Sequence, residues 1–123
     1  MAVILIVEDE VLVRESAVTM LEDLGYDVLA ASGVEEALSQ LRSPQLIDAL
    51  FTDVGLNAAV FGGCELAHHA VALRPDFPVL YTTGKLPTDD LKARFVPGAH
   101  FLSKPYSQLD LRGAVEDLFA VHV

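Results

Sequence analysis

The chain has 123 residues, of which 52% are hydrophobic, and its formal net charge is −10. This hydrophobic content excludes a disordered chain, and the length suits one domain with a single core. The acidic charge argues against direct nucleic-acid binding, which needs a basic surface, and no apolar run approaches the ~20 residues of a membrane helix.

The start of the chain has no secretory signature. Met1 leads directly into a strand-like run, without the basic segment and cleavage site of a signal peptide. We therefore expect a cytoplasmic protein without membrane insertion and a natural start at Met1. The single cysteine, Cys64, excludes an internal disulfide and is expected to be a small, semi-buried residue rather than a reactive thiol.

Five apolar segments alternate with segments of helical periodicity. Three of the apolar segments are nearly continuous, as in parallel strands that are covered on both faces. The predicted strands are residues 3–7, 27–31, 47–52, 78–83 and 99–102.

The first three helices are predicted from apolar stripes and from their termini. The first helix ends at Gly25, a residue typical of helix C-termini. Ser32 and Glu35 form a capping-box pattern for the second helix, which reaches about Leu41. The third helix ends before Pro75. The stripes of the first and third helices contain Val13, Ala17, Met20, Leu21 and Leu24, and Leu66, Ala67, Ala70 and Val71.

Two further helices begin with polar capping residues. Thr88, followed by two aspartates, opens a short fourth helix, because acidic residues favour the first turn. Ser107 with Asp110 predicts the start of the fifth helix. Its inward-facing residues are Leu111, Ala114, Val115, Leu118 and Phe119. The chain ends shortly afterwards, so we expect one domain over residues 1–123 with no output domain behind it.

This alternation predicts an α/β protein with a doubly wound, five-stranded parallel sheet. In such sheets, ligands bind outside the carboxyl ends of the strands. The polar residues at these ends are Glu8, Asp9, Asp53, Thr83 and Lys104. Clustered carboxylates repel one another, so the site is expected to attract Mg²⁺, a hard cation that prefers oxygen ligands. Carboxylates, a hydroxyl and an ammonium group together suit phosphoryl chemistry.

Four segments at the strand ends resemble the bacterial response-regulator receiver domain. Residues 6–10, 51–54, 78–84 and 101–106 match it in order and spacing, across essentially the whole chain. The resemblance implies the flavodoxin-like (βα)₅ fold with strand order 2-1-3-4-5, and one receiver domain over residues 1–123.

The resemblance also implies an acceptor and its metal ligands. Asp53 would take a phosphoryl group from a sensor histidine kinase or a histidine phosphotransfer protein. Asp9 would bind Mg²⁺ (or Mn²⁺) directly and Glu8 through water, while Asp53 and the Gly55 carbonyl would complete the ligands. The alternative for Asp53 is a helix N-cap, which is disfavoured because other polar partners converge on the same edge.

Further roles follow from the same resemblance. Thr83 would hydrogen-bond one phosphoryl oxygen, and Lys104 would pair with another. Alternation and the following glycine favour Thr83 over Thr82 as this hydroxyl. Phe101 occupies the aromatic position whose side chain turns inward on activation, with an ordinary core residue as the alternative. A cis bond before Pro105 would aim the lysine side chain inward.

The implied function is that of a signalling domain rather than an enzyme with its own substrate. Such a domain assists its own phosphorylation and dephosphorylation, which would switch a protein-binding face formed by residues 88–119. The alternatives are a phosphate shuttle or sink, and a receiver domain cut from a hybrid histidine kinase. An unphosphorylated scaffold is disfavoured by the complete set of site residues. A small-molecule phosphatase is disfavoured by Gly55, where its second acid would be expected.

The segment after the acceptor departs from the family pattern. Asn57 stands where a proline is usual, and the turn over residues 58–63 is longer than usual. Val60 and Phe61 are expected either to fold back onto the protein or to form a small apolar contact for a partner. The four histidines have no metal-ligand spacing and are expected at the surface or in helix packing.

Overall fold

The computed structural model describes residues 2–56 and 59–120 of the chain. Five strands and five helices alternate within these residues. The strands are β1 (Val3–Val7), β2 (Asp27–Ala31), β3 (Ala49–Asp53), β4 (Val79–Thr83) and β5 (His100–Ser103). The helices are α1 (Val11–Asp23), α2 (Val34–Arg42), α3 (Gly62–Leu73), α4 (Asp89–Lys92) and α5 (Gln108–Leu118).

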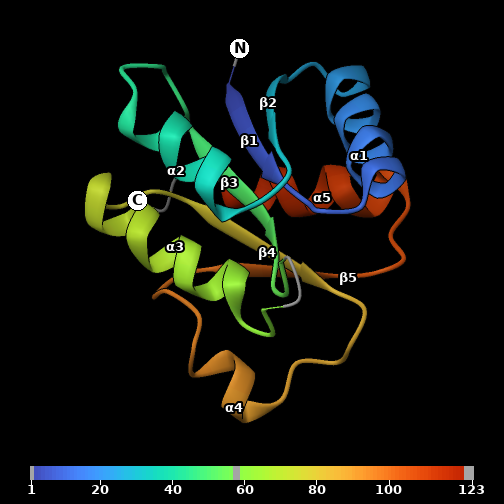
Figure 1. The fold of residues 1–123 in the computed structure, drawn as a ribbon. Coiled ribbons are helices and arrows are strands. Elements are labelled where there is room, and N and C mark those ends of the chain that lie inside the picture. The colour runs from blue at the N-terminus through green and yellow to red at the C-terminus, as the bar shows by residue number, and fades with distance from the viewer. Residues whose placement is uncertain (1, 57–58, 121–123) are drawn as a thin grey trace.

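The strands form one parallel sheet in the order β2-β1-β3-β4-β5. Helices α1 and α5 cover one face of the sheet, and α2 and α3 cover the other (Figure 1). This confirms the doubly wound, flavodoxin-like fold predicted from the sequence. All strands point the same way, so their carboxyl ends share one edge, toward which α4 also lies (Figure 1). Within residues 2–56 and 59–120, no helix is long and apolar enough to cross a membrane.

The strand boundaries differ slightly from the predicted ones. β1 and β2 begin and end as predicted, whereas β5 is shifted by one residue. β3 begins at Ala49 because Ile47 lies in the preceding loop, where its carbonyl accepts a hydrogen bond from Arg74 Nη1 (3.5 Å). β4 begins after Pro78, which has no N–H to donate to a neighbouring strand. β3 extends to Asp53, so the candidate acceptor belongs to the strand itself.

The capping box predicted for the second helix is wrong. The N-cap of α2 is Gly33, and no side chain caps the helix. Ser32 therefore lies one position too early, and Glu35 occupies the second rather than the third helical position.

Three other predicted helix termini are confirmed. Gly25 has a φ of 99° directly after the C-cap of α1, in the left-handed region that favours glycine. Thr88 Oγ1 accepts a hydrogen bond from the Leu91 N–H (3.1 Å) at the start of α4. Ser107 and Asp110 form the capping box of α5.

Helix α3 begins directly against the end of β3. The Gly63 N–H donates to the Val54 carbonyl (2.7 Å), and a Cβ on Gly63 would lie 1.7 Å from the Asp53 carbonyl oxygen. Only a glycine fits this approach. The next residue, Cys64, is buried, as expected for a small packing residue. This contact fixes the backbone that carries Asp53.

Candidate functional site

Three carboxylates meet at the carboxyl ends of β1 and β3, which are neighbours in the sheet. Asp53 is the last residue of β3, and Glu8 and Asp9 follow β1. One oxygen of each carboxylate lies within 4.8 Å of the other two. Glu8 is buried, whereas the Asp53 side chain is 16% exposed. A reactant from solvent can therefore reach Asp53.

Lys104 connects two of these carboxylates. Its Nζ lies 2.7 Å from Glu8 Oε1 and 3.5 Å from Asp53 Oδ1. The backbone N–H of Lys104 donates to the Thr83 carbonyl (3.0 Å), and the peptide bond to Pro105 is cis. The ammonium group thus balances part of the negative charge at the point where the carboxylates meet.

Burial and the neighbouring charges together shift the pKa of Asp53. The pKa of Asp53 is raised from 3.8 to about 6, mainly by burial; Lys104 opposes the shift, and the charges of Glu8 and Asp9 add to it. Burial alone would lower the pKa of Lys104, but the hydrogen bond to Glu8 and the charge of Asp53 outweigh it, so this pKa is raised. Asp53 is therefore a carboxylate that would gain from a further positive charge nearby.

This donor set fits Mg²⁺. Carboxylate oxygens are hard ligands, and the three carboxylates are close enough to share one ion directly or through water. Burial disfavours the charged form of Asp53 and raises its pKa, and a nearby cation would stabilise that charged form. Gly55, whose carbonyl the family resemblance adds to the ligands, lines the same surface hollow as the carboxylates.

The two threonines at the end of β4 face opposite sides of the sheet. Thr82 pairs in register with Asp53, so both side chains lie on the face that α1 and α5 cover. Thr83 projects to the other face, but it lines the hollow above the strand ends together with Asp53 and Lys104. Its Oγ1 accepts a hydrogen bond from the Lys85 N–H (3.4 Å). Alternation alone would thus favour Thr82, and only the position of Thr83 at the hollow supports its predicted role.

The segment after β3 folds back onto the protein. The backbones of Leu56 and Ala59 exchange two hydrogen bonds (3.1 and 2.9 Å). The Phe61 ring packs against the Arg94 guanidinium, whose central carbon lies 3.8 Å from the ring centroid. Val60 is 70% exposed. Phe61 thus shows the first of the two expected outcomes, folding back onto the protein, while Val60 is an exposed apolar side chain.

Phe101 lies at the end of an aromatic stack. The Tyr81 and Phe95 ring centroids are 4.2 Å apart, and those of Phe95 and Phe101 are 6.1 Å apart. The Tyr81 hydroxyl accepts a hydrogen bond from the Val96 N–H (3.1 Å). The stack therefore joins β4, β5 and the segment between α4 and β5.

The remaining candidates lie away from the carboxylates. His68 and His69 are exposed on α3, and His68 Nε2 lies 2.9 Å from the Arg94 carbonyl oxygen. Asn57, where the sequence departs from the family pattern, and His122 lie outside the described residues.

The sequence interpretation missed several contacts of the site. It did not predict the direct ion pair of Glu8 with Lys104, or the hydrogen bond from Arg14 Nη1 to the Glu8 carbonyl (2.9 Å). It also missed the close approach of Gly63. The two adjacent glycines at the start of a helix were the available signal for that approach.

The whole chain resembles known proteins. The sequence profile described as the response regulator receiver domain matches residues 4–116. The nitrogen assimilation regulatory protein NtrX of Azorhizobium caulinodans is 32% identical over 107 residues, which is 85% of this chain and 23% of NtrX. The chain spans less than half the length of the first curated relatives that it matches.

Solved structures give the same result. A response regulator receiver protein from Sinorhizobium medicae has a TM-score of 0.86 at 28% identity, over 95% of this chain and 93% of that chain. The receiver domain of the hybrid histidine kinase CckA has a TM-score of 0.78 at 30% identity, over 97% of this chain and 100% of that chain.

Proposed function

Since the chain belongs to the response regulator receiver domains of two-component systems, we propose that Asp53 is its phosphoacceptor. The observation that carries this proposal is the position of Lys104 Nζ, 2.7 Å from Glu8 and 3.5 Å from Asp53. A carboxylate attacks an anionic phosphoryl group only where the approaching charges are neutralised. Lys104 supplies positive charge at that point, and the ion pair with Glu8 holds it there.

The proposed reaction transfers one phosphoryl group to Asp53. A carboxylate oxygen forms the bond to phosphorus while the bond from phosphorus to the donor atom breaks, and the donor leaves with that electron pair. Mg²⁺ (or Mn²⁺), held by Asp9, Asp53 and the Gly55 carbonyl and through water by Glu8, would add further charge neutralisation. Because the transition state is loose, positioning and charge suffice without a general base.

Thr83 and Lys104 are proposed to bind the transferred group. Thr83 Oγ1 accepts from the Lys85 N–H, which leaves its own proton to donate to a phosphoryl oxygen. Lys104 would pair with another phosphoryl oxygen. These new contacts would bias the packing of Phe101 in the aromatic stack, and through it the α4–β5–α5 face. A phosphoryl group changes this face only if it binds one arrangement better than the other.

The proposed partners are a histidine kinase or histidine phosphotransfer protein upstream and a protein bound at α4–β5–α5 downstream. We take residues 1–123 as one receiver domain and place it in the cytoplasm. A receiver domain within a hybrid histidine kinase is an alternative, because the CckA receiver domain, which is 30% identical, belongs to such a kinase. A phosphate shuttle or sink would use the same residues.

Intact-mass spectrometry with a small phosphodonor tests the proposed acceptor. Acetyl phosphate with Mg²⁺ should add one phosphoryl group to the wild-type chain and none to Asp53→Asn. Because Asp9 is proposed to bind the ion directly, Asp9→Ala should require more Mg²⁺ for the same extent of reaction. Equal phosphorylation of wild type and Asp53→Asn would refute the assignment.

A further inference from the structure

A buried hydroxyl beside the acceptor has no hydrogen-bond partner. Thr82 is 4% exposed, and its Oγ1 is the one buried side-chain polar atom without a partner in the described part of the chain. The buried hydroxyl of Thr52, on β3, donates to the Asp53 carbonyl (3.0 Å). Buried hydroxyls rarely remain unpaired, because a lost hydrogen bond destabilises the fold. Thr82 Oγ1 therefore indicates a ligand.

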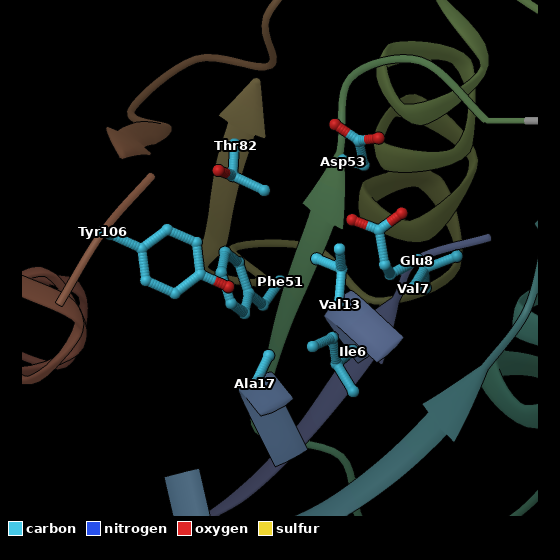
Figure 2. A pocket seen from close by; sticks show the side chains of 9 residues that line it. All are labelled: Ile6, Val7, Glu8, Val13, Ala17, Phe51, Asp53, Thr82 and Tyr106. Carbon is cyan, nitrogen blue, oxygen red and sulfur yellow. The ribbon is translucent and has the colours of Figure 1, made fainter. Parts of the chain in front are cut away.

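Thr82 faces a small cavity beneath the acceptor edge of the sheet. Apolar side chains from β1, β3 and α1 form much of its wall, and the polar side chains that line it are Glu8, Asp53, Thr82 and Tyr106 (Figure 2). Figure 2 shows these four side chains around one space, with Glu8 directly after β1, Asp53 on β3, Thr82 on β4 and Tyr106 in the segment before α5. The cavity therefore joins the acceptor strand to the segment that follows Lys104.

The size and the lining of this cavity suit one water molecule. Its volume is about 10 Å³, measured as the space open to the centre of a water molecule, which is close to the minimum for one water. A wholly apolar cavity stays dry, but a buried water needs only two to four polar partners. Thr82 provides one partner, and the carboxylates and the Tyr106 phenol lie around the same space. A larger ligand would not fit.

We propose that this cavity is a water site, and that the Thr82 hydroxyl and its water position the Asp53 carboxylate from the buried side. The proposal rests on the proposed function of Asp53 as the acceptor. Lys104 reaches Asp53 from the end of β5, whereas Thr82 lies across from it on β4, on the same face of the sheet. A water between Thr82 and the carboxylates restricts the rotation of the Asp53 side chain. Thr82 is thus a positioning residue, with a role distinct from that of Thr83.

The test compares Thr82→Val with Thr82→Ser. Valine keeps the shape of threonine and suits a strand, but it removes the hydroxyl; serine keeps the hydroxyl. We expect the phosphorylation rate constant of Thr82→Val at saturating phosphoramidate and Mg²⁺ to fall about tenfold, the effect of one hydrogen bond to a charged group. The donor concentration for half-maximal rate should stay unchanged, and Thr82→Ser should remain within about twofold of wild type.

Thr52→Val is the matched control. It removes a buried hydroxyl from the opposite face of the sheet, which does not border the cavity. It should lower the free energy of unfolding while leaving the rate within about twofold of wild type. A purely structural role for Thr82 would make its valine variant behave like this control. A Thr82→Val rate equal to that of wild type would overturn the positioning role.

The water itself is detected without any phosphorylation. In wild type, water-selective NMR should show magnetisation transfer from a long-lived water to the Thr82 methyl group and to the neighbouring Tyr106 ring. In Thr82→Val, the transfer to the Tyr106 ring should be lost. Absence of this transfer in wild type overturns the water site. If wild type accepts no phosphoryl group but shows the transfer, the proposed function fails while the water site stands.

Discussion

Charged side chains play opposite roles at the two ends of the strands. We call the side of the sheet where the strands begin the amino edge, and the side where they end the carboxyl edge. At the amino edge, the Arg74 guanidinium donates hydrogen bonds of 3.0–3.5 Å to backbone carbonyls in the last turn of α2 and in the segment between α2 and β3. These carbonyls belong to Leu41, Ser43, Gln45 and Ile47. At the carboxyl edge, three carboxylates lie close together, two of them paired with one ammonium group, and the pKa of Asp53 rises to about 6.

The charged side chain at the amino edge contributes to stability, whereas those at the carboxyl edge contribute to reactivity. Arg74 satisfies carbonyls that an irregular loop would otherwise leave unpaired, so its charge stabilises the fold. The carboxylates at the other edge destabilise the fold because they repel one another and Asp53 is partly desolvated. The same imbalance makes that edge receptive to a cation, which together with Lys104 would neutralise the charge of an approaching phosphoryl group. Helix α3 joins the edges, since it begins beside Asp53 and ends before Arg74.

The largest effect is expected where α3 meets the acceptor strand. Gly63→Ala places a Cβ 1.7 Å from the Asp53 carbonyl oxygen, and neither backbone can yield without displacing the other. We expect a loss of about 4 kcal/mol in the free energy of unfolding, measured by urea titration. Gly113→Ala, in α5, is the control, because its Cβ meets nothing within 4 Å and should slightly stabilise the helix. Equal stability of the two variants would contradict the packing argument.

Removing the Arg74 guanidinium from the amino edge should destabilise the fold. Arg74→Ala leaves the four carbonyls without their donor, and we expect it to lower the free energy of unfolding by about 3 kcal/mol. The phosphorylation rate should stay near that of wild type, because Arg74 lies at the opposite edge. A specific loss of phosphorylation in a folded Arg74→Ala protein would break the separation of the two edges.

Removing a charge at the carboxyl edge should have the opposite effect and raise the free energy of unfolding. Asp53→Asn removes a partly desolvated charge, so at pH 8 without divalent ions it should raise the free energy of unfolding by about 2 kcal/mol. The folded state holds the Asp53 proton more tightly than the unfolded state, because its pKa is raised from 3.8 to about 6. The destabilisation is therefore absent below about pH 4, develops as the pH rises to 6, and is complete above it.

Chemical denaturation across this pH range measures that difference. The control is Asp48→Asn, at the amino edge, where the Asp48 carboxylate accepts a hydrogen bond from the Val3 N–H (2.7 Å). Asparagine is a weaker acceptor, so this variant should destabilise the fold. If Asp53→Asn were also destabilising at pH 8, the fold would not disfavour the charged form of Asp53, contrary to its raised pKa.

The smallest effect concerns the segment after the acceptor. Arg94→Ala removes the contact with the Phe61 ring at the surface, and we expect a loss of about 0.5 kcal/mol in the free energy of unfolding. Arg94→Lys should retain part of it. A loss as large as that of Arg74→Ala would show that this segment is a structural element comparable to the amino edge.

The sequence predicted the carboxyl edge better than the amino edge. Uninterrupted apolar runs define buried parallel strands, and the topology then brings Glu8, Asp53 and Lys104 to one edge. Three of the four carbonyl partners of Arg74 lie in an irregular loop, where backbone groups leave no pattern in the sequence. The N-cap at Gly33 was missed because Ser32 offers the same chemistry one residue earlier.

The two adjacent threonines of β4 show a second limit of prediction from the sequence. Thr82 and Thr83 are chemically identical, and alternation assigns them to opposite faces without saying which face holds the acceptor. Only the register of Thr82 with Asp53 resolves this. The unpaired hydroxyl of Thr82 is likewise a property of packing that no residue pattern predicts.

We propose Asp53 as the single site of phosphoryl transfer, because Lys104 and a divalent ion bound by the carboxylates would neutralise the charge of the incoming group there. Fragment mass spectrometry of the domain, treated with phosphoramidate with and without Mg²⁺, tests it most directly. We predict one Mg²⁺-dependent, hydroxylamine-sensitive phosphoryl group, located on Asp53. A group on His68, His69 or His100, or transfer that does not depend on a divalent ion, would contradict the account.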